Sequence, residues 1–168
     1  MLSLKMHTEF RPAILPEELR SLVLFDHKTF AEYPSDWFAP LHWQLYKPWW
    51  LILDNRKVGC CAFEHHVDFR GDAPDDHQTP PRKGSLYIAS TAILPDSRGC
   101  GLGTLFKSWQ ISYALLHGFN RVVTNTRKSN KPMIRLNQKF GFKITRTTPH
   151  YYFDPSESTV VMELRLNS

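Results

Sequence analysis

The sequence has 168 residues, enough for one domain with a substantial core, and we treat residues 1–168 as a single domain. Its 21 basic and 16 acidic residues leave a net charge of +5, which suits a protein that binds a polyanionic cofactor but is too small and dispersed to indicate nucleic-acid binding. No stretch approaches the roughly 18 apolar residues of a membrane span, and the N-terminus lacks the apolar region of a signal peptide. The sequence therefore predicts a cytoplasmic protein that does not bind a membrane.

The first half of the chain predicts three strands and one helix. A strand is expected at residues 10–14, followed by a helix at 16–27 that has a proline and acidic residues in its first turn. Residues 33–50 are crowded with aromatic side chains and interrupted by prolines, which predicts short helical or loop segments. These rings either pack in the core or wall a substrate groove. Two strands follow at 49–53 and 57–67, joined by a hairpin turn.

The second half begins with a segment rich in Gly, Pro and Asp at residues 70–84, which predicts an exposed insert. An apolar strand is expected at 86–94, and a glycine-rich turn leads from it into a helix at 105–116. The remaining predicted elements are a strand at 121–126, a helix at 132–140, and two final strands at 142–147 and 159–166.

The three cysteines, Cys60, Cys61 and Cys100, predict neither a disulfide nor a metal site. Their number is odd, and the sequence has no Cys-x-x-Cys pair of the kind that binds zinc. Cys60 and Cys61 are neighbours in an expected strand, so their side chains should point to opposite faces of the sheet.

Residues 98–104 read Arg-Gly-Cys-Gly-Leu-Gly-Thr between the apolar strand and the helix, which predicts an anion site. Glycine lets the backbone approach a ligand closely, and the free N–H groups at a helix N-terminus attract phosphate. No lysine follows Gly103, so the turn is not a P-loop, and it lacks the third glycine of a dinucleotide fingerprint. The alternative is a turn that only connects a strand to a helix.

The spacing Arg-x-x-Gly-x-Gly resembles the pyrophosphate loop of the GNAT superfamily, the acyl-CoA-dependent N-acyltransferases. Residues 93–95, Ile-Leu-Pro, resemble the end of the preceding strand in that family, and Asn130 followed by Phe-Gly-Phe at 140–142 resembles its second motif. The resemblance covers roughly residues 50–165. It implies an α/β (α+β) fold, with a mixed, mostly antiparallel central sheet flanked by helices in the order β-α-β-β-β-α-β-α-β-β.

The resemblance also implies acetyl-CoA as the cosubstrate, an amine as the acceptor, and a monomer or homodimer. Asn130 is also positioned to cap the helix that follows it, and both roles can hold at once. The residues implied in cofactor binding are Thr91, Ala92, Ile93, Arg98, Gly99, Cys100, Gly101, Leu102, Gly103, Thr104, Asn130 and Asn137.

The C-terminal part, with Pro-His-Tyr-Tyr at 149–152, resembles the ribosomal-protein N-terminal acetyltransferases, which implies a peptide or protein N-terminus as acceptor. The catalytic glutamate of those enzymes falls on Asn125 and their proton-donating tyrosine on Asn137, and asparagine does not exchange protons near neutral pH. Two alternatives therefore stay open: a small-molecule amine such as a polyamine, amino acid or aminoglycoside, and a non-catalytic acyl-CoA sensor.

Replacement catalytic groups are expected on the strand before the insert and in the tail. Strand alternation places Glu64 and His66 on one face, where either is a candidate base. A polar strand end that faces solvent is the alternative. Tyr151 is a candidate proton donor, and Asn137 is a candidate hydrogen-bond donor to the leaving sulfur.

Overall fold

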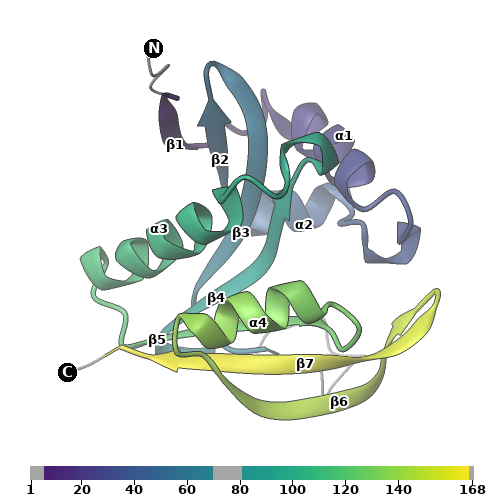
Figure 1. The fold of residues 1–168 in the computed structure, drawn as a ribbon, viewed down its shortest axis with the longest axis vertical. Coiled ribbons are helices and arrows are strands. Elements are labelled where there is room, and N and C mark those ends of the chain that lie inside the picture. The colour runs from purple at the N-terminus through teal and green to yellow at the C-terminus, as the bar shows by residue number, and fades with distance from the viewer. Residues whose placement is uncertain (1–5, 70–80, 167–168) are drawn as a thin grey trace.

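The computed structural model describes residues 6–69 and 81–166, which form one seven-stranded mixed sheet with helices on both faces (Figure 1). The predicted α/β GNAT fold and its order of elements are confirmed, with one short α-helix and two 3-10 helices added. The elements are β1 (Thr8–Pro12), α1 (Leu19–Thr29), η1 (Pro34–Asp36), α2 (Pro40–Leu45), β2 (Lys47–Leu53), β3 (Arg56–Val67), β4 (Pro81–Ile93), η2 (Pro95–Ser97), α3 (Leu102–Leu116), β5 (Arg121–Arg127), α4 (Lys131–Lys139), β6 (Lys143–Phe153) and β7 (Ser156–Arg165).

The strand order is β1-β2-β3-β4-β5-β7-β6, and β4 and β5 form its parallel pair. This pair is short. It runs from Ser85 opposite Arg121 to Ile88 opposite Thr124. Beyond Ile88, β4 pairs with β3 alone, and beyond Thr124, β5 pairs with β7 alone. The two central strands therefore part and leave a V-shaped opening in the middle of the sheet.

A β-bulge lies at the point where the strands part. The register of β3 with β4 passes from Phe63–Ile88 to Ala62–Ser90, so Ala89 is an extra residue in β4. A bulge bends its strand and increases the local twist. The bulge at Ala89 thus accounts for the divergence of β4 from β5.

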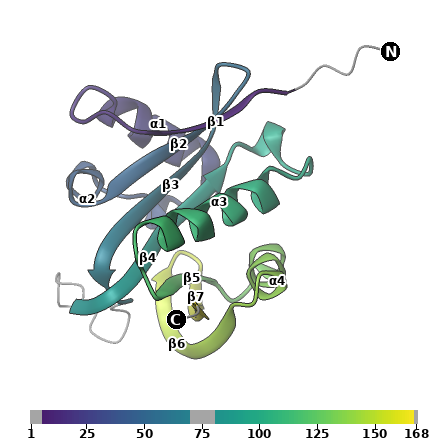
Figure 2. The same ribbon diagram turned by 90° about the vertical axis from the view of Figure 1, so that its left-hand side faces the viewer.

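The two faces of the sheet bury separate cores. Helices α3 and α4 cover one face, while α1 and α2 cover the other (Figure 2). Cys61 is buried under α3 with Phe63 and Phe106, whereas Cys60 is buried with Trp43 and Trp50 on the α1 side. The prediction that the two neighbouring cysteines point to opposite faces is confirmed.

Several predicted boundaries are wrong: β1, α1 and β7 begin two or three residues from their expected starts, and three further differences bear on the site. Strand β4 begins at Pro81, so residues 81–84 belong to a strand rather than to the expected insert, and residues 70–80 lie outside the described ranges. Helix α3 begins at Leu102, three residues before the expected start. Strand β6 continues to Phe153, because it pairs with β7 around a bulge that interrupts its simple alternation. In the described ranges, no helix combines the length and apolar character needed to cross a bilayer.

Candidate functional site

The glycine-rich turn forms an open cradle at the N-terminus of α3. Gly99 and Gly101 have φ of +79° and +86°, and a Cβ added to either would meet no atom within 4 Å. The first hydrogen bond of the helix runs from the Leu105 N–H to the Gly101 carbonyl (3.1 Å), which leaves the amides of residues 102–104 available for a ligand. The turn therefore has the backbone shape and the free donors that a pyrophosphate requires.

Arg98 holds this cradle against the rest of the fold. Its Nε donates to the Ile93 carbonyl (2.9 Å) at the end of β4, and its Nη2 donates to the Thr29 carbonyl (3.3 Å) at the end of α1. Cys100 is exposed, and its Sγ contacts the Ser97 carbonyl (3.1 Å). These contacts fix where the loop stands relative to the V-shaped opening.

The V-shaped opening leads away from this loop between β4 and β5. Thr91, Ala92 and Ile93 pair with β3 on one side and face no strand on the other within the described part of the sheet. Asn130 caps α4, where its Oδ1 accepts the Met133 N–H (3.3 Å), so the capping role proposed for it is present. An extended cofactor arm with amide groups fits such an unpaired strand edge.

Two buried amide oxygens lie beneath the V with no hydrogen-bond partner among the described residues. Gln110 on α3 donates from Nε2 to Thr91 Oγ1 (2.8 Å), but its Oε1 is unpaired. Asn137 on α4 is 1% exposed; its Nδ2 donates to the thioether sulfur Sδ of Met162 (3.7 Å), and its Oδ1 is unpaired. Buried acceptors of this kind normally have a partner. The N–H groups of a pantetheine arm are chemically suitable partners for these two acceptors, which are closed to solvent and become accessible only if the side chains over them shift. The unpaired strand edge at residues 91–93 and these acceptors together fit coenzyme A.

A row of polar side chains crosses the opposite face of the sheet near the same opening. Glu64 stands opposite Tyr87 in the β3–β4 register. The Tyr87 hydroxyl donates to Asn125 Oδ1 (2.5 Å), and Asn125 Nδ2 donates to Thr159 Oγ1 (3.1 Å). Burial raises the pKa of Tyr87 well above its usual value and also raises that of Tyr152, so both phenols stay neutral.

Tyr151 lies beside this row. It is half-buried, and its ring packs against Phe69 (5.1 Å between centroids) and edge-on against Tyr152 (4.8 Å). The β6–β7 hairpin thus brings the Tyr-Tyr pair to the Tyr87 face of the sheet.

His66 is not on the face expected for it. The β3–β4 register shifts between His65 and Val67, and His66 has φ of +60°, so strand alternation breaks at this residue. The rings of His65 and His66 both contact Phe119, at 4.9 and 5.1 Å between centroids, which places them together rather than on opposite faces. His66 is exposed, and its Nδ1 accepts the Gly84 N–H (3.0 Å). Glu64 and His66 are therefore separated.

A partly buried ion-pair cluster that the sequence did not predict lies at the open end of the V. The Arg127 guanidinium binds both carboxylate oxygens of Asp36 (2.8 and 2.9 Å) and Glu157 Oε1 (3.3 Å). It lies between the rings of Tyr33 and Tyr152, at 4.5 and 4.2 Å from their centroids. This cluster joins η1 to the β6–β7 hairpin. The signal in the sequence was an arginine at the end of the apolar strand 121–127.

The aromatic segment before β2 is fixed to α1 by Asp26. This carboxylate is 3% exposed and accepts the Phe38 N–H (2.8 Å), and the Phe38 ring packs on Trp43 (5.1 Å) and Tyr46 (5.0 Å). Several of these rings therefore pack in the α1-side core, which is one of the two roles expected for them.

Desolvation raises the pKa of Asp26 to about 6, which predicts a specific pH dependence of stability. The folded state binds the proton more tightly than the unfolded state, so the contribution of Asp26 to stability is fully present below pH ~4 and is lost as the pH rises through about 6. In urea unfolding we expect wild type to lose roughly 3 kcal/mol across this range relative to Asp26→Asn, since one pKa unit is about 1.4 kcal/mol. Parallel pH profiles for the two proteins would contradict this account.

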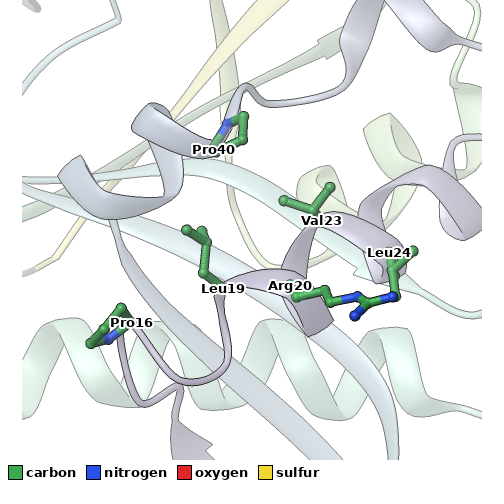
Figure 3. A pocket seen from close by; sticks show the side chains of 6 residues that line it. All are labelled: Pro16, Leu19, Arg20, Val23, Leu24 and Pro40. Carbon is green, nitrogen blue, oxygen red and sulfur yellow. The ribbon is translucent and has the colours of Figure 1, made fainter.

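An apolar hollow of about 450 Å³ lies between α1 and α2 (Figure 3). It lies outside the V, since no residue of β4 or β5 lines it. Its lining residues are Pro16, Leu19, Arg20, Val23, Leu24 and Pro40.

In ranges 6–69 and 81–166, no cluster of three or more His, Cys, Asp or Glu side chains could hold a metal ion. The glycine cradle and the V remain the candidate site.

Comparison with known proteins agrees with this geometry. The profile of the Acetyltransferase (GNAT) family matches residues 15–142, which is more than half of the chain. The chain belongs to the GNAT acetyltransferase family. The match includes the glycine cradle, both strands that border the V, and α4.

Among curated proteins, this GNAT chain is 36% identical over 84 residues to an uncharacterised N-acetyltransferase of Schizosaccharomyces pombe, a match that covers 50% of each chain. It is 32% identical over 82 residues to an N-alpha-acetyltransferase of Sulfurisphaera tokodaii, covering 48% of this chain and 49% of the relative. The chain thus spans about half the length of the curated relatives it matches. The ribosomal-protein-S18-alanine N-acetyltransferase of Escherichia coli shares the fold, with a TM-score of 0.75, 14% identity and 96% of each chain covered.

Proposed function

We propose that this GNAT protein transfers acetyl directly from acetyl-CoA to the α-amine of a peptide or protein. The observation that carries the proposal is the row Glu64–Tyr87–Asn125 beside the V, which offers one carboxylate and a neutral phenol in place of a strong base. At pH 7 the deprotonation of a lysine side chain costs about 4.6 kcal/mol, whereas an α-amine costs about 1 kcal/mol. A site with weak bases suits the α-amine.

Acetyl-CoA supplies an activated thioester, and the chain fixes it in place. In this proposal, the free amides of residues 102–104, with Gly99, Cys100 and Gly101, hold the pyrophosphate, and Arg98 keeps the loop in position. The backbone of residues 91–93 and the side chains of Asn130 and Asn137 contact the pantetheine arm. Because these contacts are in place before the cofactor binds, positioning the thioester costs little conformational entropy of the loop.

The acceptor amine would approach on the Tyr87 face. Tyr87 donates its own proton to Asn125, so its oxygen lone pairs are available to accept an amine N–H. Glu64, directly opposite in the register, is the group that receives the proton, and Tyr151 on the hairpin contacts the acceptor. His66 is a weaker candidate base because its Nδ1 is engaged with Gly84 and its ring lies toward Phe119.

The names of two similar proteins support this acceptor class. The Sulfurisphaera tokodaii relative is an N-alpha-acetyltransferase, and the Escherichia coli fold neighbour acts on an alanine of ribosomal protein S18. The Tyr-Tyr hairpin, tied to η1 through Arg127, supplies a wall of the kind that an extended peptide N-terminus needs.

Glu64→Gln is expected to lower kcat by about 10²–10⁴, the usual contribution of a positioned base, with little change in acetyl-CoA affinity. Glu9→Gln is the matched control, since Glu9 is an exposed glutamate on a strand far from the V in the sheet order. The two variants and wild type are compared by their initial rates of thiol release from acetyl-CoA. Equal rates for Glu64→Gln and wild type would remove Glu64 from the mechanism.

A panel of acceptors tests the function itself. Peptides with free N-termini should accelerate thiol release from acetyl-CoA, whereas the same peptides with blocked N-termini should not. Acceleration by a polyamine, amino acid or aminoglycoside alone would indicate the small-molecule alternative. Binding of acetyl-CoA without acceleration by any amine would indicate a sensor.

A further inference from the structure

Lys107 of α3 is a buried cation that the proposed function does not yet use. It is 1% exposed, and no ion pair involving it occurs among the described residues. Its Nζ lies 5.3 Å from the centroid of the Phe142 ring, at the end of the α4 segment. Burying an unpaired charge is costly, and an apolar side chain would fill this position without that cost.

The ammonium lies beneath the V, on the α3 side. Gly103, one turn earlier on the same helix face, faces Ile93 of β4 and Leu136 of α4. Gln110, three residues later on the same face, donates from Nε2 to Thr91 Oγ1 (2.8 Å), and Thr91 lies beyond the last β4–β5 pair. The ammonium is therefore level with the part of β4 that has no β5 partner.

The surroundings of Lys107 keep it both charged and able to give up a proton. Desolvation lowers its pKa to about 8, while burial raises the pKa of Cys61 to about 12, so the thiol stays neutral. Phe142, in the turn between α4 and β6, packs against the ammonium and does not titrate. The charged side chains of α4, at Lys131, Arg135 and Lys139, are exposed on its outer face.

We propose that Lys107 stabilises and protonates the coenzyme A sulfur as acetyl transfer proceeds, in place of the acid that Asn137 cannot supply. The inference rests on the proposed function. As the acceptor nitrogen bonds to the acetyl carbon, the carbon–sulfur bond breaks and its electron pair stays on sulfur. Lys107 gives that sulfur a proton and is reprotonated from water, while the proton lost by the amine goes to Glu64.

The test uses bound coenzyme A without any acceptor. Thiolate absorbs more strongly in the ultraviolet than thiol does, so the difference in pH titration between the complexes with coenzyme A and with desulfo-coenzyme A measures the thiol pKa. A cation at close range lowers the pKa of an acid by about one to three units, and we expect such a lowering relative to free coenzyme A. Lys107→Met should raise the bound thiol pKa by at least about one unit. Lys139→Met, an exposed lysine on α4, should leave it at the wild-type value.

The outcomes separate the two proposals. Coenzyme A that fails to bind wild type would overturn the proposed function. Coenzyme A that binds with the same thiol pKa to wild type and to Lys107→Met would overturn the role of Lys107 alone. If Lys107→Met does not fold, the affinities of the wild-type protein for coenzyme A and for desulfo-coenzyme A are compared across pH. Because the cation favours the thiolate, the ratio of the two affinities should grow as the pH rises toward the thiol pKa. A preference that does not change with pH overturns the inference.

Discussion

Gly101→Asp should weaken coenzyme A binding by roughly 100-fold or more while leaving the protein folded. Gly101 precedes the free amides of α3 at φ +86°, with open space where the new side chain would lie. An aspartate there is a good partner for those amides and would occupy the donors that the pyrophosphate needs. Two like charges about 5 Å apart near a protein surface repel by about 3 kcal/mol, which is more than 100-fold in affinity.

Gly118→Asp is the matched control. Gly118 follows α3 at its other end, has φ of +75°, and also has no atom within 4 Å of an added Cβ. The two variants introduce the same charge and a similar backbone strain at opposite ends of one helix. Calorimetric titration with coenzyme A should give the wild-type affinity for Gly118→Asp and a reduced affinity for Gly101→Asp. Equal affinities in the two variants would mean that the cradle does not hold the pyrophosphate.

Arg127→Ala should cost about 2–3 kcal/mol of stability, less than the roughly 3–5 kcal/mol for a fully buried pair, because the two carboxylates are partly exposed. The Arg127 side chain is 6% exposed, and its loss leaves the carboxylates of Asp36 and Glu157 without their shared cation. It also removes the cation between the Tyr33 and Tyr152 rings. Chemical unfolding should show the loss, and KM for a peptide acceptor should rise because the hairpin is no longer tied to η1.

Arg165→Ala provides the comparison for this cluster. Arg165 also lies at the end of a strand and is 3.8 Å from a glutamate, but its side chain is 87% exposed. Its removal should change stability by no more than about 0.5 kcal/mol. Coenzyme A affinity should be unchanged in both variants, because neither residue belongs to the glycine cradle. A similar stability loss for the two arginines would show that the cluster is not a structural tie.

The order of the elements and the glycine cradle were predictable because both depend on local sequence. The apolar strand before residues 98–104 and the glycines within them determine backbone shape directly, and the structure places an open cradle there. Even so, α3 began earlier than the hydrophobic pattern indicated, since Leu102 and Gly103 adopt helical geometry as soon as Gly101 has turned the chain.

The candidate catalytic side chains were less predictable because their positions depend on tertiary contacts. One bulge after His65 moved His66 away from Glu64, and no local pattern signals that bulge. Arg127 and Asp36 meet across 91 positions of sequence, and the buried state of Lys107 depends on how α3 packs against β3 and α4. Period-2 and period-3.6 patterns assign faces, but they do not report which residues from distant elements meet.

Mapping the transferred acetyl group tests the central claim most directly. A peptide carrying both a free α-amine and a lysine is incubated with acetyl-CoA, a polyamine and wild-type protein, and the products are assigned by fragmentation mass spectrometry. The account predicts acetyl on the peptide α-amine, none on the lysine or the polyamine, and strongly reduced transfer by Gly101→Asp at the same acetyl-CoA concentration. Acetyl on the lysine or the polyamine instead of the α-amine, or undiminished transfer by Gly101→Asp, would contradict it.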